Sequence, residues 1–325
     1  MKKALSILAF LGLVTLSTAA QKQQLTSKML YHNGPILTGT QNIYTIYYGC
    51  WTDNCASAGD TKTREIMADF FITIGNSPYA QINSTYTNAS GLPAASAFIY
   101  GGEIIDASYS HGAELTKADI VDLISYQVNN FQLPQDSNGI YVIIASADVA
   151  SSDTGFCAPS APPFHGRGIV NGVPVNYIFL GNPNRCPAVA GPQFSPSGPT
   201  PNDSYAADVL VSNLAHALNG IVTNPLGNGW YDRYGFENTD KCEDALGHPA
   251  FGQTYLTANG ARANVKLGGR HFLIQQNWVN DRKARCAMFK YQMAFSCDLS
   301  LCSDCRRQSV SRRWQPAHGT IYAFD

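Results

Sequence analysis

Short apolar segments of strand length alternate along this chain with segments that have helical spacing. Three segments are aromatic, β-branched or almost wholly apolar, which is typical of buried strands: Asn42–Tyr48, Tyr141–Ala147 and Val175–Leu180. Thr63–Ile74 has apolar residues at helical spacing, and a second helix is predicted from an N-cap at Thr116 to about Asn130. This alternation predicts an α/β fold class, a single layered domain with a mixed sheet flanked by helices.

A third helix is predicted within Asn202–Val222, where Asp203 or Ser204 can cap its start. Its apolar stripe has residues three or four apart: Ala207, Leu210, Leu214, Leu218 and Ile221. Because successive helical residues are about 100° apart, His216 is expected opposite this stripe, facing away from the core. Small neighbours such as Gly220 leave room beside the imidazole.

The N-terminus has the three-part order of a secretory signal peptide. Lys2 and Lys3 give a positive start, Ala4–Val14 is apolar, and the small residues Ser17–Ala20 precede a polar stretch. The apolar run is shorter than the roughly 20 residues that span a bilayer, so we expect cleavage near Ala20 and release. No later segment is long and apolar enough for a membrane span. We therefore predict a secreted protein of the extracellular space.

Composition and glycosylation motifs fit that location. The formal net charge is −1 and only 14% of the residues are charged, so we expect neither nucleic acid nor an anionic membrane as partner. Three Asn-x-Ser/Thr triplets are candidate glycan acceptors: Asn83, Asn88 and Asn202. Asn202 lies in a proline-rich loop and is expected to be the most exposed of the three.

Nine cysteines are expected to form disulfides in an oxidising compartment, and the odd number leaves one without an intrachain partner. Cys297, Cys302 and Cys305 are interpreted as structural sulfur rather than a zinc site, because zinc sites of this spacing carry a second close pair. These cysteines and four arginines mark an irregular C-terminal tail. The predicted organisation is a signal peptide at 1–20, one domain at 21–287 and the tail at 288–325.

Five blocks of sequence, in order along the chain, resemble the EXORDIUM, or phosphate-induced, family of plant proteins. They are Tyr31–Gly39; Ala147–Val149 with Gly155–Cys157 and Phe164–Gly166; Tyr177–Asn182 with Cys186–Pro187; Leu214–Gly229; and Phe272–Cys286. The resemblance implies a secreted protein of the cell wall, or apoplast, that is linked to growth and cell expansion and has no established reaction. Its implied partner is an extracellular ligand, with a cell-wall glycan or a receptor as the candidates.

The resemblance also implies a disulfide pattern. The plant proteins have a further cysteine near each of two positions where this chain has Ala161 and Ala190. If the two missing cysteines bonded to each other in the family, their joint loss leaves Cys157 to bond Cys186. The companion pairs are expected to be Cys242–Cys286 and Cys50–Cys55.

A second resemblance bears on His216. The stretches Gly229–Asp232 and Glu237–Cys242 are similar to those of more distant secreted relatives in which a helix carries His-Glu-x-x-Glu. In a metallopeptidase-like site such a helix binds Zn²⁺, and the Glu beside the first His activates water. Here Ala217 and Gly220 stand in place of the base and the second ligand, which implies a degenerate, non-catalytic helix without a cofactor.

The alternative is a zinc-dependent hydrolase in which His111, His165 and His216 converge as a three-histidine metal site. His111 and His165 lie in glycine-containing segments, where a structural hydrogen-bonding role is more common. Asp148, after a predicted strand, is a further candidate acid or base. The sequence has no Gly-x-Ser-x-Gly elbow, P-loop or dinucleotide fingerprint. We therefore expect a non-catalytic protein.

Overall fold

A five-stranded sheet forms the centre of the protein in the computed structural model, which describes residues 27–290 except 56–58, 159–163, 192 and 244–249. The strand order is β3-β2-β4-β6-β5, and all neighbours are parallel except β5, which is antiparallel to β6. The bounds are β2 Thr40–Tyr48, β3 Ala97–Asp106, β4 Gly139–Ala145, β5 Phe164–Val170 and β6 Val173–Leu180. This mixed sheet with flanking helices confirms the predicted α/β class.

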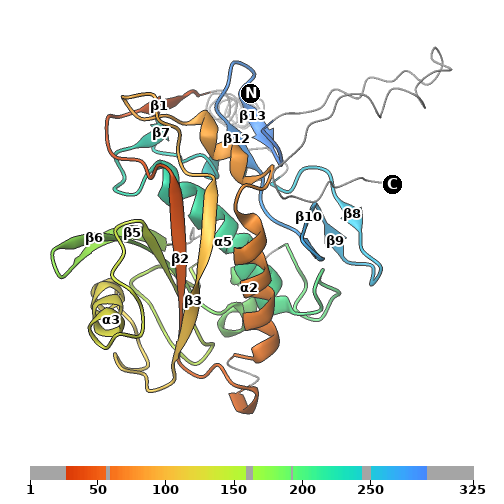
Figure 1. Ribbon diagram of the computed structural model, residues 1–325. Coiled ribbons are helices and arrows are strands. Elements are labelled where there is room, and N and C mark those ends of the chain that lie inside the picture. Colours follow the sequence, from red (N-terminus) through yellow and green to blue (C-terminus); the bar gives the residue numbers. More distant parts are fainter. Residues whose placement is uncertain (1–26, 56–58, 159–163, 192, 244–249, 291–325) are drawn as a thin grey trace, which may run out of the picture. The chain divides into compact units, whose positions relative to one another are not determined.

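Helices cover both faces of the sheet. Helix α3 (Lys117–Asn129) packs on one face, whereas α2 (Thr61–Ile74) and α5 (Tyr205–Thr223) pack on the other (Figure 1). Every residue of β4 is buried, as expected for a strand between two helical layers. Among the described residues, no helix combines the length and apolar character needed to cross a bilayer.

The predicted helix starts follow from their capping residues. Thr116 and Asp119 form a reciprocal capping box at α3, since each side chain accepts a hydrogen bond from the other's backbone N–H. Ser204 caps α5 by accepting from Ala207 N, and Asp60 caps α2 by accepting from Thr63 N. Helix α2 therefore begins two residues before the predicted start.

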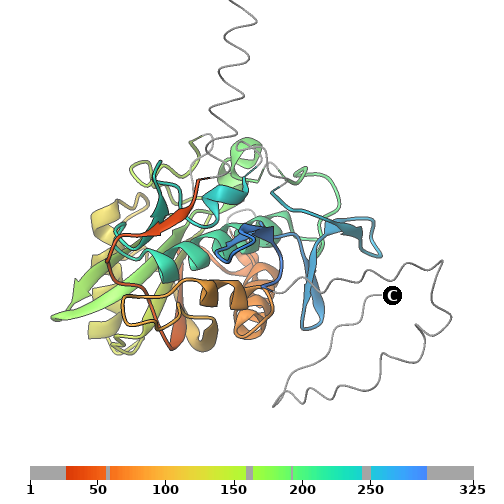
Figure 2. The ribbon, with the colours of Figure 1, turned by 90° about the horizontal axis from the view of Figure 1, so that it is seen from above.

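Small hairpins and short strands surround the sheet. Their bounds are β1 Met29–Tyr31, β7 Trp230–Asp232, β8 Tyr255–Leu256, β9 Arg262–Ala263, β10 Val265–Leu267, β11 Arg270–Phe272, β12 Asn277–Val279 and β13 Arg285–Ala287, with a four-residue helix α4 at Pro187–Ala190. The segments after residue 250, drawn in blue, lie on the side of α2 and α5 (Figures 1 and 2).

The sequence of Arg270–Trp278 predicts one further strand, but the structure divides this segment between β11 and β12. The cause is the side chain of Asn264, whose Nδ2 donates to Ile274 O at 2.7 Å and whose Oδ1 accepts from Ile274 N at 3.0 Å. Because this amide takes both backbone groups of Ile274, the strand pairing stops there.

Helix α5 is buried on nearly every side, which corrects the expectation that His216 faces away from the core. Only Tyr205 and Asn213 of its residues are not buried, and His216 is 6% exposed. Its apolar stripe packs in the core against the sheet and α2. The opposite, polar side is covered by residues 237–243 and 271–277, which come later in the chain.

Three disulfides lie within the described residues, and they are the three pairs expected from the sequence. Cys157–Cys186 joins the segment after β4 to the one after β6, and Cys242–Cys286 joins the segment covering α5 to β13. Their Cα atoms are 5.6 Å apart in both cases, and those of Cys50–Cys55 are 5.8 Å apart. Residues 1–20, Ala161 and the cysteines at 297, 302 and 305 lie outside the described residues.

The folded unit continues beyond the predicted domain end at residue 287. Met288 is buried and belongs to the core cluster that also contains residues of the sheet and α2. Lys290 Nζ donates to Ser84 Oγ at 2.7 Å, and the Lys290 carbonyl accepts from Arg285 Nη2 at 3.1 Å. The boundary of the folded unit therefore falls after Lys290 rather than before Met288.

We expect two truncations to behave differently. A chain that ends at Lys290 should keep its melting temperature, because every packing contact described above is retained. A chain that ends at Ala287 lacks the buried Met288 side chain and should lose roughly 2–5 kcal/mol of stability. Thermal and urea unfolding of the two secreted proteins would decide. Equal losses in both would place the residues after 290 in the core.

Candidate functional site

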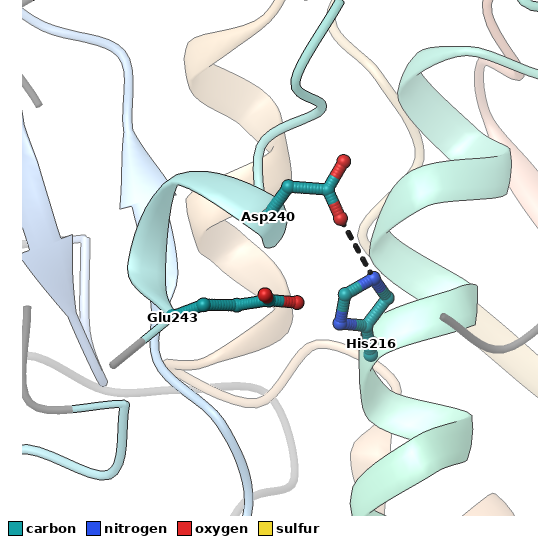
Figure 3. Close-up of side chains that lie close together, drawn as sticks. All are labelled: His216, Asp240 and Glu243. Atoms are coloured by element: carbon teal, nitrogen blue, oxygen red, sulfur yellow. Dashed lines mark ion pairs between the residues drawn. The ribbon is translucent and has the colours of Figure 1, made fainter. Parts of the chain in front are cut away.

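His216 on α5 faces two carboxylates that come from the segment after β7 (Figure 3). Its Nε2 lies 3.1 Å from Asp240 Oδ1, and the imidazole is 7% exposed against 22% for the Asp240 side chain. Asp240 begins a 3-10 turn that ends at Cys242, and Glu243 follows it. One ligand atom from each of His216, Asp240 and Glu243 lies within 4.8 Å of the others.

The electrostatics favour a charged pair. Burial disfavours the imidazolium, but the hydrogen bond and charge of Asp240, helped by Gln275 and Glu243, outweigh it and raise the pKa of His216 to about 9. Burial alone would raise the pKa of Asp240, but His216 and the backbone N–H of Glu237 lower it overall. In the absence of another cation, His216 and Asp240 form an ion pair.

Gln275 fixes the orientation of the imidazole. Its Nε2 donates to Thr239 O at 2.7 Å and to Cys242 O at 3.3 Å. Both amide hydrogens are therefore used, and Oε1 lies 2.9 Å from His216 Nδ1. Because an amide oxygen only accepts, Nδ1 is the donor in this contact. The other ring nitrogen, Nε2, is directed at the carboxylates.

A second histidine–carboxylate pair lies one helical turn further along α5. His165 Nε2 on β5 is 3.1 Å from Glu237 Oε2, and Glu237 Oε1 accepts from Asn224 Nδ2 at 2.6 Å. A Cβ atom at Gly220 would lie 2.6 Å from Glu237 Oε2 and 2.7 Å from His165 Nε2. Glycine at position 220 therefore gives this pair its space against the helix.

A fully buried ion pair fixes the position of residues 237–243, which cover the polar side of α5. Lys241 Nζ lies 2.9 Å from Asp232 Oδ2, both side chains are 0% exposed, and Ser27 Oγ bonds to both groups. The lysine also sits over the Trp278 ring, 5.2 Å from its centroid. Burial opposes the charge of Asp232, but Ser27, Lys241 and two backbone N–H groups hold its pKa below the ordinary value.

The three histidines of the predicted metal site do not converge. His165 and His216 lie on the α5 side of the sheet. His111 lies on the other side with α3, where its ring contacts Tyr126 and its backbone N–H donates to Tyr48 Oη. The sheet therefore separates His111 from the other two, and the three-histidine arrangement is wrong. Asp148 accepts hydrogen bonds from Ser146 and Tyr109, which use its two carboxylate oxygens.

The three candidate glycan acceptors differ in their surroundings. Asn83 is 0% exposed and accepts from Asn277, so the folded chain has no room for a glycan there. Asn202 is half-buried rather than exposed, and its Nδ2 donates to Asp208 at 2.6 Å and to His271 O at 2.9 Å. Asn88 uses its side-chain oxygen for local backbone bonds, which leaves its amide nitrogen for a glycan.

Sequence reasoning missed the carboxylates that complete the His216 site. The metallopeptidase-like pattern has its acids on the helix itself, where α5 has Ala217 and Gly220, whereas Asp240 and Glu243 come from a later segment. The similarity of Glu237–Cys242 to the acidic run of distant relatives was the available signal. Gln275 has no sequence signal, because its role depends on the segment between β11 and β12, which belongs to no strand.

Comparisons with known proteins match most of the chain to one family. The family model described as the phosphate-induced protein 1 conserved region matches residues 29–289. Protein EXORDIUM-like 5 of Arabidopsis thaliana is 29% identical over 302 residues, which cover 82% of this chain and 80% of that protein. Protein EXORDIUM of the same plant is 28% identical over 312 residues, 82% of this chain and 92% of its own length. Protein PHOSPHATE-INDUCED 1 of Nicotiana tabacum is 26% identical over 238 residues, 66% and 70% of the two chains. No solved structure matches the chain significantly.

Replacing Lys241 should destabilise the protein strongly, because Lys241→Met leaves the Asp232 carboxylate buried without its cation. The expected loss is roughly 3–5 kcal/mol, and the double variant Lys241→Met/Asp232→Asn should recover part of it. Urea unfolding measures both. The control is Asp281→Asn, at a half-exposed pair with Arg285, for which less than about 1 kcal/mol is expected. Equal effects at the two sites would contradict the anchoring role of Lys241.

The effect of Gly220→Ala on stability should have opposite signs in the natural chain and in a chain without the His165–Glu237 pair. In the natural chain the added methyl group forces His165 and Glu237 apart, so we expect a net loss of stability. In a chain that carries His165→Ala and Glu237→Ala there is no pair to displace. Alanine should then stabilise α5 by up to about 1 kcal/mol, its advantage over glycine in helices. The same sign in both backgrounds would show that position 220 does not support the pair.

Proposed function

The chain belongs to the phosphate-induced protein 1, or EXORDIUM, family, as its sequence motifs predict, and from this membership we propose that it is a secreted protein of the extracellular space and cell wall. It acts there by binding an extracellular ligand, a cell-wall glycan or a receptor, in a process linked to growth and cell expansion. It does not act by catalysis.

Secretion is supported by the cysteine chemistry. Disulfides form and persist in oxidising compartments and are rare in the cytosol. The three bonds join segments that are 5, 29 and 44 residues apart in sequence. The signal-peptide pattern before Gln21 provides the route, and the triplet at Asn88 is compatible with modification in the same pathway.

The main observation that supports a non-catalytic role is the environment of His216. A hydrolytic metal site needs a general base beside the metal-bound water. The helix has Ala217 next to His216, and the nearby carboxylate of Glu237 is held by Asn224 and His165. His216 itself is buried and bonded at both ring nitrogens, to Gln275 and Asp240. This arrangement supports a structural polar core.

The proposal predicts that the full chain, expressed in a eukaryotic secretory host, is exported with an N-terminus near Gln21 and sediments with isolated plant cell walls. The same protein should release neither sugars from the walls nor peptides from casein. A product that stays inside the cell with Met1 intact would contradict secretion. Hydrolysis that stops on chelation would contradict the non-catalytic role.

The exported protein should carry a glycan at Asn88 and none at Asn83. Glycopeptide mapping by mass spectrometry measures the occupancy of each site. Ser90→Ala removes the acceptor triplet at Asn88 through an exposed residue and should abolish the glycan there without loss of stability. Occupancy at Asn83 would contradict the buried position of that side chain.

A further inference from the structure

We propose that His216, Asp240 and Glu243 bind one divalent metal ion, with Zn²⁺ as the best-suited ion, which fastens the segment after β7 to helix α5. This site goes beyond the extracellular binding role proposed above. It requires no catalytic step, and it differs from the three-histidine site, because two of its ligands are carboxylates.

The donor atoms have the spacing of ligands that share one ion. Ligands at about 2.0–2.2 Å from a tetrahedral metal lie roughly 3.3 Å from each other. His216 Nε2 and Asp240 Oδ1 are 3.1 Å apart, and an oxygen of Glu243 completes a set whose members all lie within 4.8 Å. The Asp240 and Glu243 side chains reach toward the imidazole from the same turn (Figure 3). A tetrahedral ion would require the widest of these separations to shorten by at most about 1.5 Å.

The imidazole is oriented for coordination through Nε2. A metal-bound histidine usually donates its other ring N–H to an oxygen, which fixes the tautomer and the ring plane. Gln275 Oε1 is that acceptor for Nδ1 at 2.9 Å, and its own amide hydrogens are taken by the Thr239 and Cys242 carbonyls. Gln275 is therefore bonded to the same turn that supplies the carboxylates.

The charges of the three groups favour a divalent ion. Coordination through Nε2 displaces the proton that His216 shares with Asp240 in the metal-free protein. The resulting neutral imidazole and two carboxylates carry a net charge of about −2, which one divalent cation balances. The nearest basic side chain of the turn, Lys241, is committed to Asp232 on the opposite side. Nitrogen and carboxylate oxygen together suit Zn²⁺ better than Mg²⁺ or Ca²⁺, which prefer oxygen alone.

The ligand turn is held from its other side. Lys241 and Cys242 point away from α5, one into the buried pair with Asp232 and the other into the bond with Cys286. Asp240 and Glu243, on either side of them, point toward His216. The ligands are thus placed by a rigid support before an ion arrives, which lowers the cost of ordering them.

The test uses the full secreted chain, freed of metal with a chelator and dialysed. Isothermal titration with Zn²⁺ should give one ion per chain, and the bound ion should raise the melting temperature. Asp240→Asn and Glu243→Gln should each weaken binding at least tenfold. Gln275→Met should weaken it by roughly 10–100-fold through the orientation of His216.

The matched control is Glu237→Gln, which changes a nearby carboxylate outside the set and should keep the affinity unchanged. The proposal would be overturned if the natural chain bound no Zn²⁺, or if Asp240→Asn and Glu243→Gln bound Zn²⁺ with the affinity of the natural chain. If Asp240→Asn does not fold, the Zn²⁺ affinity of Glu243→Gln, at a partly exposed residue, provides the test. A failure to bind Zn²⁺ would not contradict the proposals of secretion and wall binding, because those are tested without added metal.

Discussion

The buried pair between Lys241 and Asp232 is the constraint on which the polar interior of this protein depends. A fully desolvated lysine requires its anion, and here an aromatic face and the Ser27 hydroxyl complete its surroundings. The pair fixes the turn at residues 240–243, in which Lys241 and Cys242 make contacts on one side and the flanking Asp240 and Glu243 face His216 on the other. Lys241 and Cys242 are buried in the interior, and Asp240 and Glu243 place their carboxylates beside His216. A polar helix face could not be buried without such a fixed cover.

Helix α5 shows how a sequence pattern can mislead about burial. Its stripe of apolar residues correctly indicates the side that packs on the sheet. The polar side has the composition of a solvated surface, yet it is buried because segments distant in sequence supply hydrogen-bond partners for His216 and Asn219. Asn219, for example, donates to Tyr79 Oη at 2.9 Å. Such hydrogen-bond networks favour one packing arrangement, since their polar groups lose their partners if the segments packed on α5 shift.

The sequence was informative where structure depends on local chemistry. Strand β4 and the capping box at Thr116 follow from patterns within a dozen residues, and the fold class follows from the alternation of such patterns along the chain. The disulfide pairing follows from a family resemblance. Strands β3 and β5 were not predicted, because each is an edge strand with two glycines and little apolar periodicity. The His216 site was incomplete, because its carboxylates lie more than twenty residues away along the chain. Contacts of that kind leave no periodic trace in a sequence.

The position of Ser27 has a consequence for how the chain is made. Its hydroxyl joins the buried pair through Lys241, which is 214 residues later in the sequence. At the usual 5–20 residues per second, a ribosome needs about 10–40 s to deliver that partner after Ser27 has emerged. During this interval all five strands of the mixed sheet are synthesised, while β1 lacks its partner strand β7 for nearly the whole time. Closure of the interior is therefore a late event of synthesis, and Ser27, near the start of the described chain, is among the last residues to gain its partners.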